Sequence, residues 1–455
     1  MLCCLQKRWL IAFVLALTGC NAEARLIGQP APLLPLPAGI EVAFNHNPRH
    51  RYRSPVHGSW RQGDDLEAFL LESIQGAEQE ILMAVQELSL PRIAEALVAK
   101  HQAGVTVQLV LENSYSTPWS EQHPADLTPR GRHRLAQMQA LGHGDALAIL
   151  QKGGVPMLDD TADASAGSGL MHHKFLVVDG QVVTTGSANF SPSGLHGDPE
   201  DQRSRGNVNH LLRLHSPDLA ALFREEFLRM WGDGPGGVQD SLFGLAKRAG
   251  PMRWTQVGEV TVGVLFAPHR RNDPNNGLDL LLMQLKTTRQ RADLALFVLS
   301  DQRLGNRLGD LHDRGVAIRL LADSSFANRS YSEVLDLLAV ELPDHRCRIE
   351  ADNQPRRQAI EGIGIPKLSG GDKLHHKLAV LDDSRVITGS FNWSPAAAHQ
   401  NDETLLVIHS PVLAAHFRAE IDRLWRGAEL GVSRRLAQKR EQQRQRCGSG
   451  RPLKS

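Results

Sequence analysis

Cysteine is scarce in this chain of 455 residues, and its five copies are poorly placed for a disulfide scaffold or a zinc site. Cys3, Cys4 and Cys20 lie within the first 20 residues, and Cys347 and Cys447 stand alone without a Cys-x-x-Cys spacing. Because Cys447 sits in the C-terminal tail, we do not expect a bridge between it and Cys347.

The chain also lacks an excess of charge of one sign. Lys plus Arg number 51 and Asp plus Glu number 50, so the net charge is only +1. The first 20 residues carry +2 and the last 22 carry +7, which leaves −8 for the body between them. A mildly acidic body argues against strong, general binding of nucleic acids, although it allows a local basic groove. Aromatic residues make up only 5%, so a stacking platform for single strands is not expected.

No apolar run is long enough to cross a bilayer as a helix, which needs about 20 residues. The run Trp9 to Leu17 follows Lys7 and Arg8 and suits the apolar part of an export signal. Leu17-Thr18-Gly19-Cys20 then resembles a bacterial lipobox, in which cleavage precedes a lipidated Cys20. Ordinary cleavage after Ala24 is the alternative. We therefore expect an exported protein, either a lipoprotein of the bacterial cell envelope or a secreted protein.

What the sequence does contain is an internal repeat. Residues 172–192 and 375–395 are identical at 12 of 21 positions. The similarity extends to both sides, because residues 101–111 resemble 312–321 and residues 216–231 resemble 410–425. The chain is therefore a duplication.

Each copy of the repeat predicts an α/β half, in which a buried strand is followed by an amphipathic helix and a second strand. These segments are Ile81–Val85, Arg92–His101 and Val105–Leu111 in the first half, and Leu294–Val298, Arg303–His312 and Val316–Leu321 in the second. The Ser-Pro pairs at 216 and 410 predict helix starts, because Ser caps a helix and Pro fits its first position.

The predicted boundaries follow from the extent of the repeat. Residues 1–20 are expected to be a signal peptide, 36–235 the first half and 258–428 the second half. Residues 21–35 and 236–257 are expected to be linkers. Residues 429–455 are expected to be a basic tail, with a frayed helix followed by disorder.

The repeated motif predicts a hairpin that gathers polar side chains. Asp179-Gly180 lies between two apolar strands, which is a strong turn signal. Because side chains alternate faces along a strand, His172 and Lys174 point the same way, and Ser187 and Asn189 share a face at the end of the returning strand. Asp179 is out of phase with them, so we expect it to be structural.

The second half builds the same set from His375, Lys377, Ser390 and Asn392, with Asp382 at the turn. If the halves pack around a pseudo-twofold axis, the two sets converge on one point. Two ammonium groups with amides and hydroxyls suit a bound phosphoryl group. One histidine can attack phosphorus while the other protonates the leaving oxygen, so neither a metal nor another cofactor is required. The sequence itself does not decide which histidine does which.

His-x-Lys-(x)4-Asp-(x)6-Gly-Ser-x-Asn, present twice, resembles the HKD motif of the phospholipase D superfamily, and the resemblance covers residues 36–428. It implies two α-β-α subdomains that face each other about a pseudo-twofold axis. It also implies a metal-free phosphodiesterase with a covalent phosphohistidine. Carried over, the resemblance makes His172 the nucleophile and His375 the general acid.

The two halves differ after the motif. Family members commonly have an acid that orients a catalytic histidine, and Glu403 matches that position in the second half, whereas Asn209 stands there in the first. The first half also has nine extra residues in the segment Ser193–Gly206, which includes Asp198, Glu200 and Asp201. This insertion could supply the missing acid, or it could be a solvated surface loop.

The leading prediction is a phospholipase D that acts on phospholipid head groups as a monomer, because one chain carries both motifs. A nuclease with the same chemistry, a transphosphatidylase similar to cardiolipin synthase, and a weakened binding module suggested by Asn209 are the alternatives. Two basic segments, Asn45–Arg53 and His269–Asn272, follow corresponding apolar stretches. They could guide an anionic substrate to the ends of the strands, or they could be solvated loops.

Overall fold

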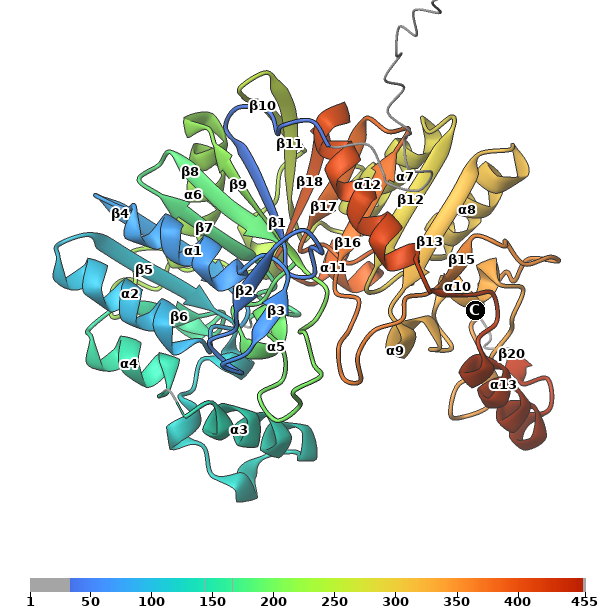
Figure 1. Cartoon of the computed structure of the whole chain (residues 1–455), viewed down its shortest axis with the longest axis horizontal. Helices are drawn as coiled ribbons and strands as arrows, with labels where there is room; N and C mark the ends of the chain where they lie inside the picture. The colour runs from blue at the N-terminus through green and yellow to red at the C-terminus, as the bar shows by residue number, and fades with distance from the viewer. Residues whose placement is uncertain (1–32, 143, 166, 453–455) are drawn as a thin grey trace, which may run out of the picture. The chain divides into compact units, whose positions relative to one another are not determined.

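Two β-sheets of related topology organise the chain, of which the computed structural model describes residues 33–142, 144–165 and 167–452 (Figure 1). The predicted signal peptide and Cys20 lie outside these residues. In spatial order, the first sheet contains β1 (Ile40–Phe44), β9 (His210–His215), β8 (Val182–Gly186), β7 (Lys174–Val178), β4 (Glu80–Val85), β5 (Thr106–Leu111) and β6 (Met157–Asp159).

The second sheet repeats this order and extends it at both edges. It contains β10 (Arg253–Val257), β11 (Val260–Ala267), β18 (Glu403–His409), β17 (Arg385–Gly389), β16 (Lys377–Leu381), β12 (Arg291–Leu296), β13 (Ala317–Ala322), β15 (Ile363–Ile365) and β19 (Glu429–Leu430). Neighbours are antiparallel from β1 to β4 and from β11 to β12, and the next two pairs in each sheet are parallel. The duplication is therefore visible strand by strand.

Helices cover both faces of each sheet, so each half is an α-β-α sandwich. The outer layers are α1 (Leu66–Gln75), α2 (Pro91–Gln102) and α4 (Ala146–Lys152) in the first half, and α7 (Gly277–Lys286), α8 (Gln302–Asp313) and α10 (Glu333–Leu337) in the second. The inner faces carry α6 (Pro217–Trp231) and α12 (Pro411–Trp425).

Further helices, two small sheets and several 3-10 turns accompany these layers in the described residues. The remaining helices are α3 (Pro129–Leu141), α5 (Pro192–Leu195), α9 (Ser324–Ala327), α11 (Pro395–His399) and α13 (Arg434–Cys447). Two small sheets pair β2 (Arg51–Arg53) with β3 (Trp60–Gln62) and β14 (Arg348–Ile349) with β20 (Arg451–Pro452). Single 3-10 turns span Asn113–Tyr115, Trp119–Glu121, Pro124–Asp126, Ala162–Ala164 and Gly244–Lys247.

The pattern within β4 shows why the sheets are covered on both faces. Successive side chains of a strand point to opposite sides. Ile81, Met83 and Val85 pack in the outer cluster with α1 and α2, whereas Leu82 and Ala84 lie in the inner cluster. All five are fully buried, so the strand is a continuous apolar run, as in other doubly covered sheets.

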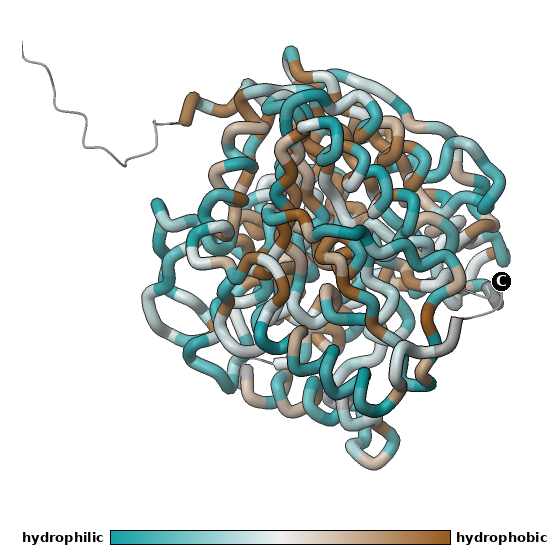
Figure 2. The backbone as a smooth tube through the Cα atoms, turned by 90° about the vertical axis from the view of Figure 1, so that its right-hand side faces the viewer, coloured by the Kyte–Doolittle hydropathy of each residue, from teal (hydrophilic) through white to brown (hydrophobic). Residues whose placement is uncertain are grey.

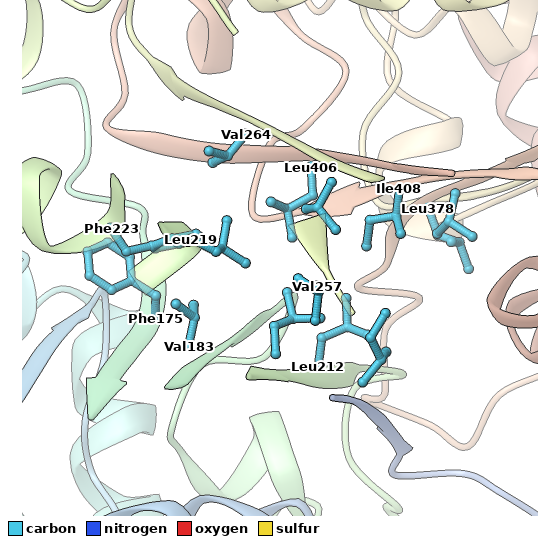
Figure 3. Packing of buried hydrophobic residues seen from close by; sticks show 14 of the residues in the cluster. Phe175, Val183, Leu212, Leu219, Phe223, Val257, Val264, Leu378, Leu406 and Ile408 are labelled. Carbon is cyan, nitrogen blue, oxygen red and sulfur yellow. The ribbon is translucent and has the colours of Figure 1, made fainter. Parts of the chain in front are cut away.

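One hydrophobic cluster joins the inner faces of the two sheets, and Figure 3 shows Phe175 and Phe223 of the first half in it together with Leu378 and Leu406 of the second. Edge-on ring contacts cross between the halves, with centroids 5.1 Å apart for Phe223 and Phe266. In Figure 2 the hydrophobic stretches of the chain gather inside the fold and the hydrophilic ones around it. The halves are therefore built on a common core.

The strands and helices predicted from the repeat are confirmed, with ends that shift by up to three residues. The predicted helix starts are confirmed as well, because the hydroxyls of Ser216 and Ser410 accept hydrogen bonds from the backbone N–H groups of Leu219 and Leu413. Local signals suffice here, since a cap and an apolar pattern act within a few residues.

The predicted linker over 236–257 is too long. The strand β10 pairs with β11 over its full length, so the second sheet begins before residue 258. Lys247, in the same segment, is buried and forms ion pairs with Glu226 and Asp402. The segment is therefore a structural part of both halves.

The helix predicted in the tail is confirmed as α13, but the disorder predicted after it is wrong over the described residues, because β20 pairs with β14. The helix α13 packs on the second half through Leu436, which is 2% exposed and belongs to that half's core. The Lys439 ammonium donates to the backbone oxygen of Asn328 at 2.6 Å. A disulfide joins Cys347 to Cys447, contrary to expectation. The tail is rich in charged residues, which favours disorder, but Leu436 packs in the core of the second half and Cys447 lies within reach of Cys347.

Candidate active site

The two repeated motifs form the hairpins β7–β8 and β16–β17, and their aspartates lie at the turns. Asp179 has a φ of 51° and Asp382 a φ of 50°. The Asp179 carboxylate accepts hydrogen bonds of 2.7–2.9 Å from the backbone N–H groups of residues 78–80. Asp382 accepts 2.8–3.2 Å bonds from those of residues 289–291. These contacts tie the first hairpin to the start of β4 and the second to the start of β12, in keeping with the structural role predicted for both residues.

His172 and His375 stand just before β7 and β16, and each backbone segment is held by the other half. The N–H of His172 donates to the carbonyl of Asp402 at 2.9 Å, and the N–H of His375 donates to the carbonyl of Val208 at 3.1 Å. Met171 and Leu374, one residue earlier, form the matching β-bridges with Asp402 and Val208. This reciprocal exchange is the pseudo-twofold arrangement that the sequence predicted.

The histidine side chains also find their partners across the boundary between the halves. His172 Nδ1 lies 2.7 Å from Glu403 Oε2. His375 Nδ1 lies 3.0 Å from Asn209 Oδ1 and 3.0 Å from the backbone oxygen of Ser187. Because a carbonyl oxygen can only accept, Nδ1 of His375 carries a hydrogen and Nε2 faces the site. Asn209 therefore occupies the orienting position itself.

The site is strongly electropositive and buried. Burial, with the charges of Lys174 and Lys377, holds the pKa of His172 and of His375 well below the usual value. Burial lowers the pKa of Lys174 to about 7, and burial together with Lys174 lowers the pKa of Lys377. Burial also raises the pKa of Glu403 to about 7. An anionic phosphoryl group would relieve the mutual repulsion of the two lysines.

The lysines point back to the histidine segments. Lys174 Nζ donates to the carbonyl of His172 at 2.7 Å, and Lys377 Nζ donates to that of His375 at 2.8 Å. Lys377 Nζ also lies 3.2 Å from His375 Nε2. Histidine and lysine are thus within reach of one bound group, as the His-x-Lys spacing predicted.

The serines of the motif are placed differently from the prediction that they bind phosphate. Ser187 Oγ donates to Asn209 Oδ1 at 2.8 Å, and Ser390 Oγ donates to Glu403 Oε2 at 2.6 Å. The cause is the pairing of β8 with β9 and of β17 with β18, which brings each hydroxyl against the start of the next strand. Both serines therefore hold the group that orients a histidine.

The asparagines of the motif retain hydrogen-bonding capacity. The side-chain oxygens of Asn189 and Asn392 are buried, and neither has a hydrogen-bond partner in the part of the chain that the structure describes. Leaving a buried amide oxygen unpaired costs free energy. The two amides are therefore suited to contact a substrate, which agrees with their predicted place in the phosphate-binding set.

The insertion Ser193–Gly206 does not supply an acid to His375. Asp201 pairs with Arg203, Glu200 lies 3.5 Å from His133, and the Asp198 side chain forms a hydrogen bond with Ser193. The alternative of a replacement acid from this segment is thus wrong, and the orienting role falls to Asn209.

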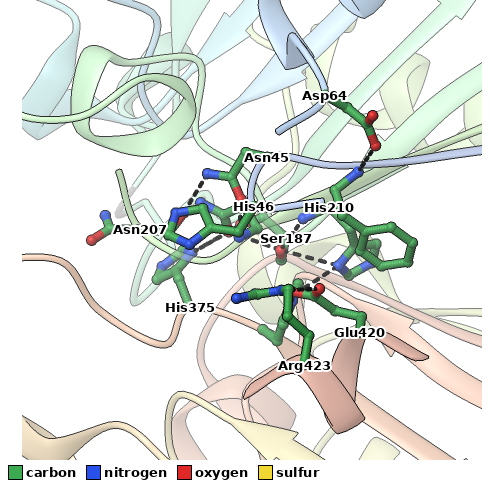
Figure 4. A network of polar contacts seen from close by, with 12 residues as sticks. Asn45, His46, Asp64, Ser187, Asn207, His210, His375, Glu420 and Arg423 are labelled. Carbon is green, nitrogen blue, oxygen red and sulfur yellow. Dashed lines mark hydrogen bonds and ion pairs between the residues drawn. The ribbon is translucent and has the colours of Figure 1, made fainter. Parts of the chain in front are cut away.

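Sequence reasoning missed the second histidine of each motif. His173 lies 2.9 Å from the Thr404 hydroxyl and 3.3 Å from Glu226 Oε1. His376 lies 3.2 Å from Glu420 Oε1, and its Nδ1 is 3.0 Å from that of His210, a residue that Figure 4 shows beside Glu420 and Ser187. A signal was available, because each glutamate is the tenth residue after the serine of its Ser-Pro pair.

The walls beside the two lysines differ in chemistry. Gln86 and Phe297 occupy equivalent positions, one residue after β4 and after β12. Lys174 Nζ donates to Gln86 Oε1 at 3.2 Å, whereas the Phe297 ring lies 4.9 Å from Lys377 Nζ and 4.7 Å from the His375 ring.

A second pair of positions continues this difference. Tyr115 is the fourth residue after β5, and Phe326 is the fourth residue after β13, the corresponding strand of the second sheet. The Arg134 guanidinium lies 4.7 Å from the centre of the Tyr115 ring, and Phe326 packs on Phe297 with ring centroids 4.5 Å apart. The first half therefore presents a polar wall and the second half an apolar one.

Within residues 33–142, 144–165 and 167–452, no helix is long and apolar enough to cross a membrane. Over the same ranges, no three His, Cys, Asp or Glu side chains are grouped so as to hold a metal ion.

Comparison with known proteins agrees with the geometry. A family model described as "Cardiolipin synthase, PLD-like domain" matches residues 70–231 and 281–425, once in each half. The mitochondrial cardiolipin hydrolase of Xenopus tropicalis is 30% identical over 146 residues, which are 32% of this chain and 59% of that protein. A phospholipase D of Rickettsia bellii is 28% identical over 160 residues, 35% of this chain and 67% of that protein. The chain thus spans somewhat more than half the length of the Xenopus relative.

Among solved structures, the phosphatidylserine synthase of Haemophilus influenzae Rd KW20 aligns with 88% of this chain and 89% of its own. Its TM-score is 0.51 at 12% identity, so the likeness concerns the fold alone. Because the family model matches most of both halves, the chain belongs to the phospholipase D-like family and is an enzyme of that superfamily with two copies of the domain.

Proposed function

We propose that this protein hydrolyses the phosphodiester bond to a phospholipid head group through a phosphohistidine intermediate. The observation that carries the proposal is the reciprocal pairing of His172 with Glu403 and of His375 with Asn209 beside two buried lysines. An imidazole can attack phosphorus, and a bound phosphoryl anion would offset the charges of Lys174 and Lys377 and so favour the protonated form of His375.

In the first step, His172 Nε2 attacks phosphorus and the bond from phosphorus to the head-group oxygen breaks. Protonated His375 gives its proton to that oxygen, which leaves as an alcohol. Glu403 accepts a hydrogen bond from His172 Nδ1 and so stabilises the positive charge that the ring acquires. The phosphoryl oxygens are held by Lys174, Lys377, Asn189 and Asn392.

In the second step, neutral His375 accepts a proton from water as the water oxygen attacks phosphorus. The bond from phosphorus to His172 Nε2 breaks, and both histidines return to their starting states. An alcohol in place of water would give a transphosphatidylase. This second candidate is supported by the family model, which is named for cardiolipin synthase.

A lipid substrate is supported over a nucleic acid by the walls of the site. Phe297 and Phe326 pack at 62° to each other beside His375, which favours an apolar neighbour of the phosphate over a flat stack of bases. The mildly acidic body also disfavours a polyanion. The names of the relatives, cardiolipin hydrolase and phospholipase D, point the same way.

The place of action is part of the proposal. Residues 1–20 are proposed to export the protein, and Cys20 to anchor it by lipidation in the bacterial cell envelope. We further propose that the enzyme acts as a monomer. The variant Cys20→Ala is expected to move the protein from the membrane fraction to the soluble fraction, and unchanged fractionation would reject the lipobox.

The decisive experiment offers two substrates to the purified protein in excess chelator. We expect release of a labelled head group from phospholipid at an undiminished rate, and little cleavage of labelled DNA at moderate salt. Faster cleavage of DNA would favour the nuclease instead. Loss of activity in chelator that one divalent ion restores would refute the metal-independent mechanism. Adding ethanol separates transfer from hydrolysis, because transfer yields phosphatidylethanol.

A further inference from the structure

The hairpin β2–β3 has two faces with different surroundings. Its register pairs Arg51 with Gln62, Tyr52 with Arg61, and Arg53 with Trp60. Residues directly opposite each other on an antiparallel pair share a face. Tyr52 and Arg61 therefore lie on one face, and the other pairs lie on the opposite face.

The inner face fixes the hairpin to the insertion Ser193–Gly206. The Tyr52 hydroxyl lies 3.0 Å from His196 Nδ1, and the Arg61 guanidinium donates to the backbone oxygens of Ser204 and Gln202. At the base of the hairpin, Gly63 has a φ of 145°, and a Cβ there would lie 1.9 Å from the Asn45 carbonyl oxygen. The position therefore requires glycine, and the hairpin has a defined orientation.

The insertion connects the hairpin to the active site. Asn207, directly after it, accepts a hydrogen bond from the backbone N–H of Lys373 at 3.0 Å, two residues before His375. Asn45, the first residue after β1 in the connection that carries the hairpin, accepts one from the N–H of Asn209 at 2.9 Å. Figure 4 shows Asn45 and Asn207 near His375, and in Figure 1 the hairpin lies where the two sheets meet. The hairpin is thus linked to the active site through Asn45 and the insertion.

That outer face combines cations with an exposed indole. Trp60 is 66% exposed, and the Arg51 guanidinium lies 5.1 Å from the centre of its ring. Arg49, Arg51 and Arg53 are all exposed, and none of them forms an ion pair within the described residues. The body of the chain carries a net charge of −8, so three arginines without acidic partners on one short segment form a local positive region.

The second half has no counterpart of this face. Residues 45–65 separate β1 from α1, whereas only residues 268–276 separate β11 from α7. The shorter connection has two exposed arginines, Arg270 and Arg271, and no aromatic residue. It therefore offers a matched control with similar charge and a corresponding place in the fold.

We propose that the outer face of the hairpin, which carries Arg51, Arg53 and Trp60 and is preceded by the exposed Arg49, docks on the surface of an anionic phospholipid bilayer; this rests on the proposed action on phospholipids. Indole rings favour the boundary between head groups and hydrocarbon, because one part of the ring is apolar and its N–H is a donor. Guanidinium groups bind phosphate in a bidentate manner and are attracted by the negative potential of such a surface. A single exposed ring that is already covered by Arg51 offers no row of platforms for nucleobases.

The test measures hydrogen exchange of the full chain with vesicles. Phosphatidylcholine vesicles that contain phosphatidylglycerol are expected to slow amide exchange in residues 49–62, and pure phosphatidylcholine vesicles to do so much less. The triple variant Arg51→Gln, Arg53→Gln, Trp60→Ala should weaken vesicle binding about tenfold or more, because two attractive charges and an interfacial ring are lost. Its turnover of a soluble nitrophenyl phosphodiester and its urea midpoint should match those of the native protein. The variant Arg270→Gln, Arg271→Gln should bind vesicles as the native protein does.

Three results would overturn the proposal: no protection of residues 49–62, an equal loss of binding in the control variant, or protection by DNA instead of vesicles. The proposed function is judged separately. Protection by vesicles without release of a lipid head group would keep the docking surface and reject the hydrolysis of phospholipids. Hydrolysis of soluble short-chain phospholipid without protection would do the reverse.

Discussion

The two halves share a frame and differ in charge at its centre. Both contribute a histidine held by a backbone bond from the other half, and both place a residue at the start of a strand to orient the opposite histidine. That residue is Glu403 for His172 and Asn209 for His375. The two halves therefore have the same geometry, but one has a carboxylate where the other has a neutral amide.

This difference gives a physical reason for unequal roles. A histidine that becomes phosphorylated acquires a positive charge, which Glu403 can stabilise through Nδ1 of His172. Asn209 fixes the orientation of His375 without such stabilisation, which makes protonated His375 a stronger acid. The asymmetry therefore agrees with the roles that the family resemblance implies.

The largest expected effect breaks the comparison altogether. The variants His172→Ala and His375→Ala should each lower kcat by about 10⁴-fold or more, and the double variant should be no worse, because residues of one site act as a unit. With a nitrophenyl substrate, whose leaving group needs no proton, His375→Ala protein denatured in alkaline detergent should retain the phosphoryl label and His172→Ala protein should not.

Labelling in the opposite pattern would exchange the two roles. Two additive losses of about half the activity each would instead mean two separate sites, against the single shared site proposed here.

The next effect compares the two orienting residues. Glu403→Gln should lower kcat on the nitrophenyl substrate by about 10²–10⁴-fold, because the amide no longer stabilises charge on His172. Asn209→Ala should cost about tenfold, since the backbone oxygen of Ser187 still accepts from His375 Nδ1. Steady-state kinetics of both variants test this order. A greater loss for Asn209→Ala would show that the neutral partner matters more than the acid.

A third prediction concerns stability in the layer behind the site. Lys247 neutralises Glu226 of the first half and Asp402 of the second, whereas Arg423 pairs with Glu420 within the second half. Lys247→Met should lower the free energy of unfolding by about 3–5 kcal/mol, and Arg423→Met by roughly half as much, because it leaves one carboxylate instead of two without a cation. Urea unfolding at neutral pH measures both.

The pH dependence of that effect has a definite sign. Burial alone would raise the pKa of Glu226, but the charge of Lys247 outweighs it and holds the pKa at about 2. A lowered carboxyl pKa contributes stability above the unfolded value, and this contribution disappears as the pH falls from the ordinary range of Glu towards 2. The difference between native protein and Lys247→Met should therefore shrink on acidification, and a constant difference would contradict the ion pair as its cause.

The smallest effect restores the symmetry of the halves. Asn209→Asp places a carboxylate against His375 Nδ1, which favours the protonated ring and should raise the pKa of His375. If His375 is the acid, it must be protonated, so the alkaline limb of the kcat/KM profile should move to higher pH. Movement of the acidic limb instead would assign it the task of nucleophile.

Much of the fold could be predicted because its signals are local or duplicated. The Asp-Gly turn, the Ser-Pro caps and the alternating strands act over a few residues, and the second copy of each motif distinguished function from chance. The packing of the tail could not be predicted in this way, because the contacts of Leu436 and Cys447 are with residues of the second half that are distant in the sequence.

The sequence by itself determined the duplication, the α/β class and the residue types gathered at the site. Only the tertiary structure decided that each histidine is oriented by a residue of the other half, that the motif serines hold those residues, and that Asn209 keeps the place of an acid. The reason is that a strand specifies the faces of its own side chains, whereas the partner of a side chain depends on which strands the common core brings together.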